Sequence, residues 1–136
     1  MQKIRATAIV IKDNLVLVVQ RYRDGQTYFV LPGGKVEEGE SPEQAVIREL
    51  YEETSIKAVI KEKVFEFEDK EQRLHQLFLC ELISGQPELR KDSPEFSKMN
   101  ENNSYFPRWV SVQDIKTNVI WPETTKESLL SLLKNP

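Results

Sequence analysis

The sequence contains a single cysteine, a single histidine and no long apolar segment. One cysteine, Cys80, cannot form an intramolecular disulfide. Because His75 is the single histidine, the chain also lacks the ligands of the usual Cys and His zinc sites. The longest apolar run, Leu15 to Val19, has five residues. A secretory signal needs an apolar core of about 7–15 residues, and a membrane helix needs about 20. We therefore expect a cytoplasmic protein with no membrane partner.

Glycine and proline are also too scarce for a low-complexity or collagen-like chain, with 5 and 7 residues of 136. The net charge is −3 and the isoelectric point is about 5.3, so no basic surface for duplex nucleic acid is expected. Hydrophobic residues make up 39% of the chain, which is enough for one core. We expect a single domain over residues 1–136. The sequence does not distinguish a monomer from a homodimer.

Short apolar segments separated by turn residues predict a sheet. The strands expected from β-branched and aromatic residues cover residues 4–11, 15–20, 28–31, 58–68, 74–83 and 108–112. The first two run apolar with little alternation, which predicts burial on both faces. The polar stretch 90–104 is either a long loop or a short helix with weak signals.

One helix start is unambiguous. Ser41 is a good N-cap, Pro42 suits the first helical position, and Gln44 completes a capping box, so a helix is expected from Pro42 to about Thr54. A second helix should follow Pro122, where leucines recur at helical spacing. The elements together predict an α+β domain, with a mostly antiparallel or mixed sheet covered by two helices.

The first helix gathers three carboxylates. At 100° per residue, Glu49, Glu52 and Glu53 share one side, together with Ala45, and the apolar residues take the other. Like charges about 5 Å apart repel, which a solvated acidic helix face would tolerate through exposure and salt. A hard divalent cation such as Mg²⁺ would make the cluster favourable, and Arg48 can pair with Glu52 one turn away.

Two glycines precede this helix. Gly33 and Gly34 lack a Cβ, so their backbone can approach a ligand or adopt a positive φ. With the helix they form a loop–helix segment over residues 34–56 that resembles the Nudix box. The matching pattern is Gly34-x5-Glu40-x7-Arg48-Glu49-Leu50-x-Glu52-Glu53-x-Ser55-Ile56.

The one departure from the family pattern is Ser55, where the box has glycine. This position follows the helix, where glycine relieves a left-handed conformation. Serine there is expected to shift the turn or reduce stability slightly. It removes no proposed ligand.

The resemblance implies a small MutT-like Nudix hydrolase with an α/β/α sandwich fold and a mixed sheet. Such enzymes cleave a phosphoanhydride in a nucleoside diphosphate derivative, for example a nucleoside triphosphate, with Mg²⁺ or Mn²⁺. By position, the resemblance implies that Glu49, Glu52, Glu53 and the Gly33 carbonyl hold the metal. Arg48 would orient a carboxylate, and Glu40 would be a ligand or an outer partner.

Three assignments stay open. The general base is a box glutamate or a glutamate from the later polar segment, Glu95 or Glu101. Arg21, Arg23, Tyr28 and Phe29 line a nucleotide pocket, or they are ordinary strand residues with the arginines solvated and Phe29 in the core. His75 is expected to be a polar residue at a strand edge, with no dyad partner nearby.

Two other functions compete with hydrolysis. A Nudix fold can bind or sense a nucleotide without cleaving it, although such a module would be expected to lose carboxylates that this chain keeps. A structural domain whose helix binds Ca²⁺ is the weaker alternative. The residues of the box bind the diphosphate and the metal, and not the base or the leaving group. The candidate substrates therefore still include ADP-ribose, nucleotide sugars, dinucleoside polyphosphates and oxidised nucleotides.

Overall fold

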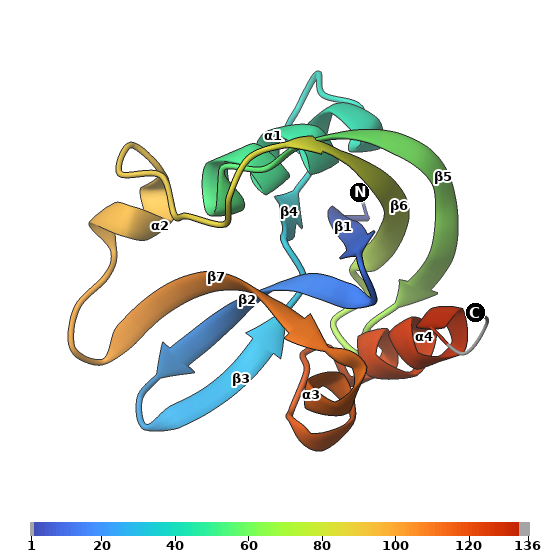
Figure 1. Ribbon diagram of the computed structural model, residues 1–136. Helices are drawn as coiled ribbons and strands as arrows, with labels where there is room; N and C mark the ends of the chain where they lie inside the picture. Colours follow the sequence, from blue (N-terminus) through green and yellow to red (C-terminus); the bar gives the residue numbers. More distant parts are fainter. Residues whose placement is uncertain (1, 134–136) are drawn as a thin grey trace.

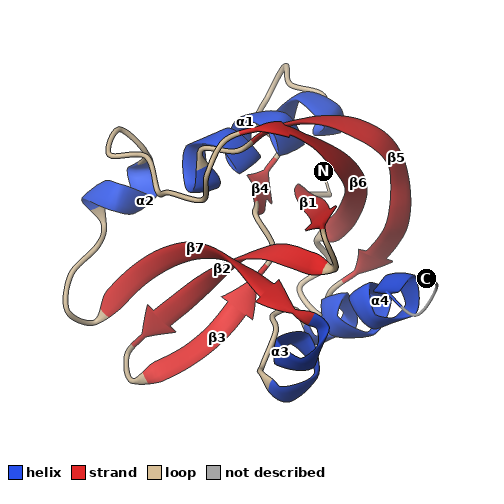
Figure 2. Cartoon of the chain, in the orientation of Figure 1, coloured by secondary structure: helices blue, strands red, loops and turns tan. Residues whose placement is uncertain are grey.

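The computed structural model describes residues 2–133, which form a mixed sheet of seven strands with helices on both sides (Figures 1 and 2). The strand order is β3-β2-β1-β6-β5, with β4 added beside β1 and β7 added beside β2. The strands are β1 (Ile4–Lys12), β2 (Leu15–Arg23), β3 (Gln26–Val30), β4 (Gly33–Lys35), β5 (Lys57–Glu68), β6 (Leu74–Ser84) and β7 (Asn103–Ser111). The predicted α+β class is confirmed.

Strand β1 belongs to both halves of the sheet. Its first part pairs in parallel with β6 and antiparallel with β4, and its last residues, Ile11 and Lys12, pair with β2. Asp13 and Asn14 form the tight turn to β2 and both have positive φ angles, as a two-residue hairpin of this kind requires. The central strands are buried on both faces, as predicted: Ala8 packs in one apolar cluster and Ile9 in another.

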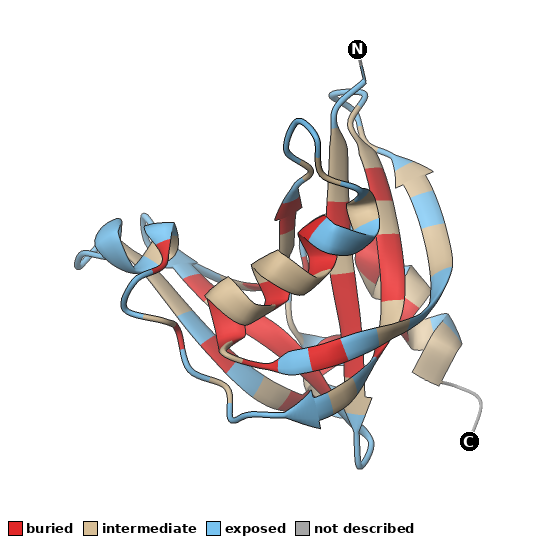
Figure 3. Ribbon diagram, turned by 90° about the horizontal axis from the view of Figure 1, so that it is seen from above, coloured by how far each residue is buried: buried red, intermediate tan, exposed pale blue. Residues whose placement is uncertain are grey.

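Within the described residues, four helices accompany the sheet, not the two that the sequence predicts. They are α1 (Pro42–Thr54), α2 (Pro94–Ser97), α3 (Val112–Thr117) and α4 (Glu123–Leu133). Helix α1 lies against β1, β4 and β5 on one side of the molecule, and α3 and α4 lie on the other (Figure 1). In Figure 3 the buried residues of α1 face the strands beneath it. Within residues 2–133, no helix has the length and apolarity needed to cross a membrane.

The remaining differences from prediction concern elements that depend on pairing. Strand β7 begins at Asn103, well before the predicted Arg108, because it pairs with β2 along that strand's whole length. Strand β4 was not predicted, since Gly33 and Gly34 have little β propensity and are held by pairing with β1. Helix α3 was also missed. The polar stretch 90–104 was expected to be either a long loop or a short helix, and it contains one short helix, α2.

Candidate active site

The first helix begins and ends as predicted. The Ser41 hydroxyl accepts a hydrogen bond from the Gln44 N–H at 3.1 Å, and the Gln44 side chain accepts one from the Ser41 N–H at 2.9 Å. This capping box, with Pro42 in the first turn, fixes the start of α1. The carboxylates that follow are therefore borne on a rigid element.

Ser55 ends the helix in the left-handed conformation, with φ of 63°. Its N–H donates to the Tyr51 carbonyl at 2.9 Å, as a capping residue should. Its hydroxyl donates to the Glu88 carbonyl at 2.6 Å. Serine thus keeps the backbone geometry that glycine favours, and it gains a hydrogen bond that glycine could not make.

The three box carboxylates are not equally exposed. Side-chain exposure is 32% for Glu52 and 13% for Glu49, and Glu53 is buried at 6%. The predicted division of α1 into an apolar face and a carboxylate face is wrong at Glu53 and Ala45, which are both buried. Glu53 lies at an angle of about 20° from Val46 around the helix, so it borders the core.

The strand β4 covers this side of the helix. The Gly33 N–H donates to Glu53 Oε1 at 3.0 Å. A Cβ added to Gly34 would lie 2.6 Å from Glu49 Cδ, so only glycine lets the strand approach the carboxylate this closely. The side chains of Glu49 and Glu53 therefore lie between α1 and β4.

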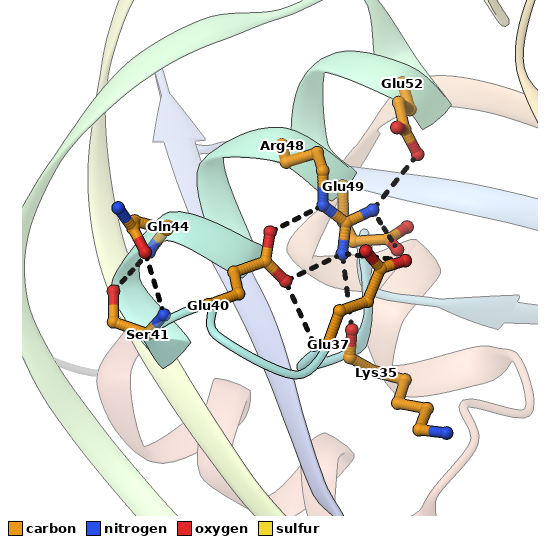
Figure 4. Close-up of polar contacts among 8 residues, drawn as sticks. All are labelled: Lys35, Glu37, Glu40, Ser41, Gln44, Arg48, Glu49 and Glu52. Atoms are coloured by element: carbon orange, nitrogen blue, oxygen red, sulfur yellow. Dashed lines mark hydrogen bonds and ion pairs between the residues drawn. The ribbon is translucent and has the colours of Figure 1, made fainter.

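Arg48 links the acidic groups to one another (Figure 4). It donates to both oxygens of Glu40, from Nε at 2.7 Å and from Nη2 at 3.0 Å. Its Nη1 donates to Glu49 at 2.9 Å and to Glu52 at 3.4 Å, and its Nη2 also donates to the Lys35 carbonyl. Both oxygens of Glu40 thus accept hydrogen bonds from Arg48.

The electrostatics follow from these contacts. The hydrogen bond from Arg48 holds the pKa of Glu40 below its usual range, and the same bond raises the pKa of Arg48. Burial raises the pKa of Glu49 and raises that of Glu53 well above its ordinary value. The charges of Glu49 and Glu95 raise the pKa of Glu53 further, while the Gly33 N–H opposes the shift.

Glu95 brings a fourth carboxylate to this group. It lies on α2, whose N-cap is Ser93 with a 3.1 Å hydrogen bond from the Phe96 N–H. Its Oε1 is buried and has no hydrogen-bond partner. The charge of Glu95 raises the pKa of both Glu49 and Glu53. The other candidate base, Glu101, is exposed in the turn before β7.

The donors at this site fit a hard divalent cation. Carboxylate and carbonyl oxygens are the ligands that Mg²⁺ prefers, and a buried carboxylate oxygen without a partner is costly unless something binds it. Within residues 2–133, however, no three acidic, histidine or cysteine side chains form a preassembled metal site. Arg48 instead holds Glu49 and Glu52.

Arg21 lies on the sheet face that carries Leu17, a residue of the apolar cluster under α1. It is 8% exposed, and its guanidinium stacks 3.8 Å above the centre of the Tyr105 ring. It donates to the Ser104 carbonyl and to the Asn103 side chain. The residues on β7 that fix Arg21 could not be identified from sequence, since nothing marked their pairing with β2.

The other candidate nucleotide-binding residues, Arg23, Tyr28 and Phe29, do not lie together in one place. Tyr28 pairs with Arg21 across β2 and β3, and its ring is 6.0 Å from the guanidinium. Arg23 is exposed at the end of β2. Phe29 is 5% exposed and packs in the apolar cluster beside α3 and α4, which is the core position left open for it.

The expectation for His75 was wrong. It is buried, its Nε2 lies 2.8 Å from Asp69 Oδ2, and its ring stacks on Phe67 at 4.7 Å between centres. The hydrogen bond with His75 is the main reason that the pKa of Asp69 is lowered. Asp69 also accepts from Arg73 Nε at 2.8 Å. The pair closes the β5–β6 turn, away from the box carboxylates.

Comparison with known sequences gives a family match over nearly the whole chain: a model described as NUDIX domain matches residues 1–129. An ADP-ribose pyrophosphatase of Methanocaldococcus jannaschii is 35% identical over 101 residues, which are 70% of this chain and 60% of that protein. An 8-oxo-dGTP diphosphatase of Escherichia coli K12 is 33% identical over 102 residues, or 69% of this chain and 78% of the relative. The chain thus spans less than two thirds of the archaeal protein.

Solved structures agree on the fold. A structure described as MutT, from work on Aliivibrio salmonicida and Vibrio cholerae, superposes with a TM-score of 0.73. The match covers 98% of each chain at 22% sequence identity. At this identity the likeness establishes the arrangement of strands and helices.

Proposed function

Because the chain belongs to the Nudix family, we propose that it is a metal-dependent pyrophosphohydrolase that cleaves a phosphoanhydride in a nucleoside diphosphate derivative. The observation that carries this proposal is the buried carboxylate group at β4: Glu53, Glu49 and the unpartnered oxygen of Glu95. A structural helix face would place such groups in water, because burying them together is unfavourable. The two curated relatives, a pyrophosphatase and a diphosphatase, agree with this reaction class.

The residues that would hold Mg²⁺ or Mn²⁺ are Glu49, Glu52, Glu53, Glu95 and the Gly33 carbonyl. When bound, the cation would offset negative charge on the phosphate oxygens as water attacks phosphorus. Glu40 acts through Arg48, since both of its oxygens are occupied by that guanidinium.

Arg48 has a positioning role. It fixes Glu49 and Glu52 from one side while Glu40 fixes Arg48 from the other. A planar guanidinium can serve three carboxylates at once because its donors point in fixed directions. Rotamers held in this way reduce the reorganisation needed when substrate binds.

Two carboxylates can accept the proton of the attacking water. Glu53 has a raised pKa, which makes it a stronger base, and Glu95 has an oxygen free of hydrogen bonds. Replacing each by glutamine separates the two roles. Loss of the base lowers kcat at saturating metal, whereas loss of a metal ligand raises the metal concentration needed for half-maximal rate.

The experiment is hydrolysis of a nucleotide panel with Mg²⁺ or Mn²⁺ and identification of the products. Glu53→Gln is expected to lower the rate by at least about 10²-fold. Glu43→Gln is the matched control, since Glu43 is an exposed carboxylate in the first turn of the same helix. Equal rates for Glu53→Gln and wild type would overturn the proposal. Nucleotide binding without turnover in the wild type would favour the sensing module.

A further inference from the structure

The segment between β6 and α2, residues 85–93, is bound to the C-terminal end of α1 (Figure 1). The Glu88 N–H donates to the Thr54 carbonyl at 2.9 Å, and the Glu88 carbonyl accepts from the Ser55 hydroxyl at 2.6 Å. Leu89, the next residue, is buried. The first half of the segment is therefore fixed to the helix that bears the box carboxylates.

Arg90 adds a side-chain contact to the same helix. Its Nη1 donates to the Tyr51 hydroxyl at 2.7 Å, and its guanidinium carbon lies 4.5 Å from the centre of the Tyr51 ring. Asp92 binds the rest of the guanidinium, accepting from Nε at 3.0 Å and from Nη2 at 3.1 Å. Because the guanidinium is planar, a carboxylate and an aromatic side chain together fix its orientation. Arg90 therefore connects α1 with the residues that lead into α2.

The backbone of Arg90 is hydrogen-bonded to the start of α2. Its carbonyl accepts from the Ser93 N–H at 3.0 Å and from the Ser93 hydroxyl at 2.7 Å. The same hydroxyl accepts from the Phe96 N–H at 3.1 Å, which makes Ser93 the N-cap of α2. Ser93 is buried, and Glu95 follows it by two residues. The contacts therefore run from Tyr51 through Arg90 to the helix that bears Glu95.

The other end of α2 is bound to a different part of the fold. The Lys98 carbonyl accepts from the Asn103 side chain at 3.2 Å, and the Asn103 side chain accepts in turn from Arg21 on β2. These contacts hold α2 against β2 and β7. The contacts of Glu88 and Arg90 hold it against α1, and that of Arg90 can be removed by changing a side chain.

Glu95 needs contacts of this kind to stay in place. Among the described residues, its buried Oε1 has no hydrogen-bond partner, and its charge acts on Glu49 and Glu53. Desolvation and the repulsion between carboxylates both favour movement of Glu95 into water when no cation is bound. Contacts elsewhere in the segment must therefore offset this tendency.

We propose that Arg90 is a positioning residue: its contact with Tyr51 holds Glu95 within reach of a cation bound by the α1 carboxylates. This inference rests on the function proposed above, because it takes Glu95 as a metal ligand. Among the described residues, Arg90 forms its ion pair with Asp92 and not with a box glutamate. It therefore acts on metal affinity through Glu95.

A double-mutant cycle on metal affinity tests this role. Mn²⁺ binding without nucleotide is measured by electron paramagnetic resonance for the wild type, Arg90→Met, Glu95→Gln and the double variant. Arg90→Met should raise the Kd for Mn²⁺ about 10-fold, as loss of a residue that orients a metal ligand does. In the Glu95→Gln background, the same substitution should change the Kd by less than about 2-fold, because no carboxylate is left to position.

Two further variants control for folding and for charge. Lys91→Met removes the same charge from an exposed side chain in the same segment, so it should leave the Kd unchanged in both backgrounds. Tyr51→Phe keeps the ring and removes only the hydroxyl that accepts from Arg90. It should raise the Kd by about 3-fold, which is within the range expected for one hydrogen bond.

Amide hydrogen exchange in the metal-free protein gives a readout that needs neither metal nor turnover. The Phe96 N–H, which donates to Ser93, should exchange about 10-fold faster in Arg90→Met than in Lys91→Met. Equal exchange in these two variants, or the same rise in Kd on Arg90→Met in both Glu95 backgrounds, would overturn the positioning role. The expected exchange and Mn²⁺ results, without turnover of any nucleotide in the panel, would overturn the proposed hydrolysis alone.

Discussion

Gly34 lies so close to Glu49 that a Cβ on the glycine would be 2.6 Å from the carboxylate carbon. No side chain fits at position 34 unless Glu49 or strand β4 moves. Since β4 also carries the N–H that binds Glu53, movement of the strand would disturb two box glutamates together. This contact explains why a glycine is needed here although its φ angle lies outside the left-handed region.

Gly34→Ala should therefore reduce activity more than stability. We expect a rate loss of about 10²-fold, because a small displacement of an active-site group is costly. The free energy of unfolding should fall by about 1–3 kcal/mol from overpacking. Gly25→Ala is the control: Gly25 has φ of 85° and open space around it. It should lose stability through backbone strain and keep its rate, and a Gly34→Ala enzyme with wild-type turnover would contradict the argument.

The sequence was sufficient to predict the elements whose signals are local. The capping box of Ser41 and Gln44 set the start of α1, and the apolar runs located β1, β2, β5 and β6. Strand β4 and the first half of β7 could not be predicted in this way, because their strand conformation comes from pairing with β1 and β2.

The sequence was sufficient to name the residues of the candidate site, but not to predict how they are arranged. The helical periodicity predicted that Glu53 faces solvent, yet Glu53 borders Val46 and is covered by β4. No local pattern in the sequence predicted β4. Among the glutamates of the later polar segment, the sequence left both Glu95 and Glu101 open as the general base. The placement of α2 favours Glu95. A signal was available there, since Ser93 and Pro94 repeat the Ser–Pro start of α1.

Arg48→Lys should show how much of the site depends on a planar guanidinium. Arg48 makes four hydrogen bonds to Glu40, Glu49 and Glu52, and a lysine ammonium cannot reproduce their directions. We expect turnover to fall about 10- to 100-fold and the free energy of unfolding to fall by about 1–3 kcal/mol. Steady-state kinetics and urea denaturation measure the two effects, and wild-type values for both would rule out the positioning role.

The raised pKa of Glu53 gives the metal-free protein a contribution to stability that is lost as pH rises. Between its unfolded value of 4.5 and its higher folded pKa, folded Glu53 holds a proton that the unfolded chain releases. The contribution of Glu53 to the free energy of unfolding therefore decreases through this range. Glutamine has no such proton, so Glu53→Gln should match the wild type near pH 4 and exceed its stability near pH 8.

Urea denaturation in EDTA across this pH range measures the difference. Groups that do not act on Glu53, such as Glu40 with its lowered pKa, contribute equally to both proteins and cancel. Glu49 and Glu95 do act on Glu53, and the glutamine variant removes their repulsion with its charge, which adds to the expected difference at high pH. Glu43→Gln should follow the wild type at every pH. If Glu53→Gln were less stable than the wild type at pH 8, the carboxylate would be ionised and stabilising in the folded protein, and the burial argument would fail.

Ser55 provides a test of how the chain tolerates the departure from the glycine of the box. Its left-handed φ costs about 1–2 kcal/mol relative to glycine, and its hydroxyl bond to Glu88 returns about 1 kcal/mol. Ser55→Gly removes both terms, so its free energy of unfolding should stay within about 1 kcal/mol of the wild-type value. Ser55→Ala keeps the strain and loses the bond, so it should be less stable than the wild type by about 1 kcal/mol and less stable than Ser55→Gly by about 1–2 kcal/mol. Thermal denaturation of the three proteins decides the matter. An alanine variant as stable as the wild type would mean that the Glu88 contact contributes nothing, and a glycine variant no more stable than that alanine variant would mean that the turn itself is unstrained.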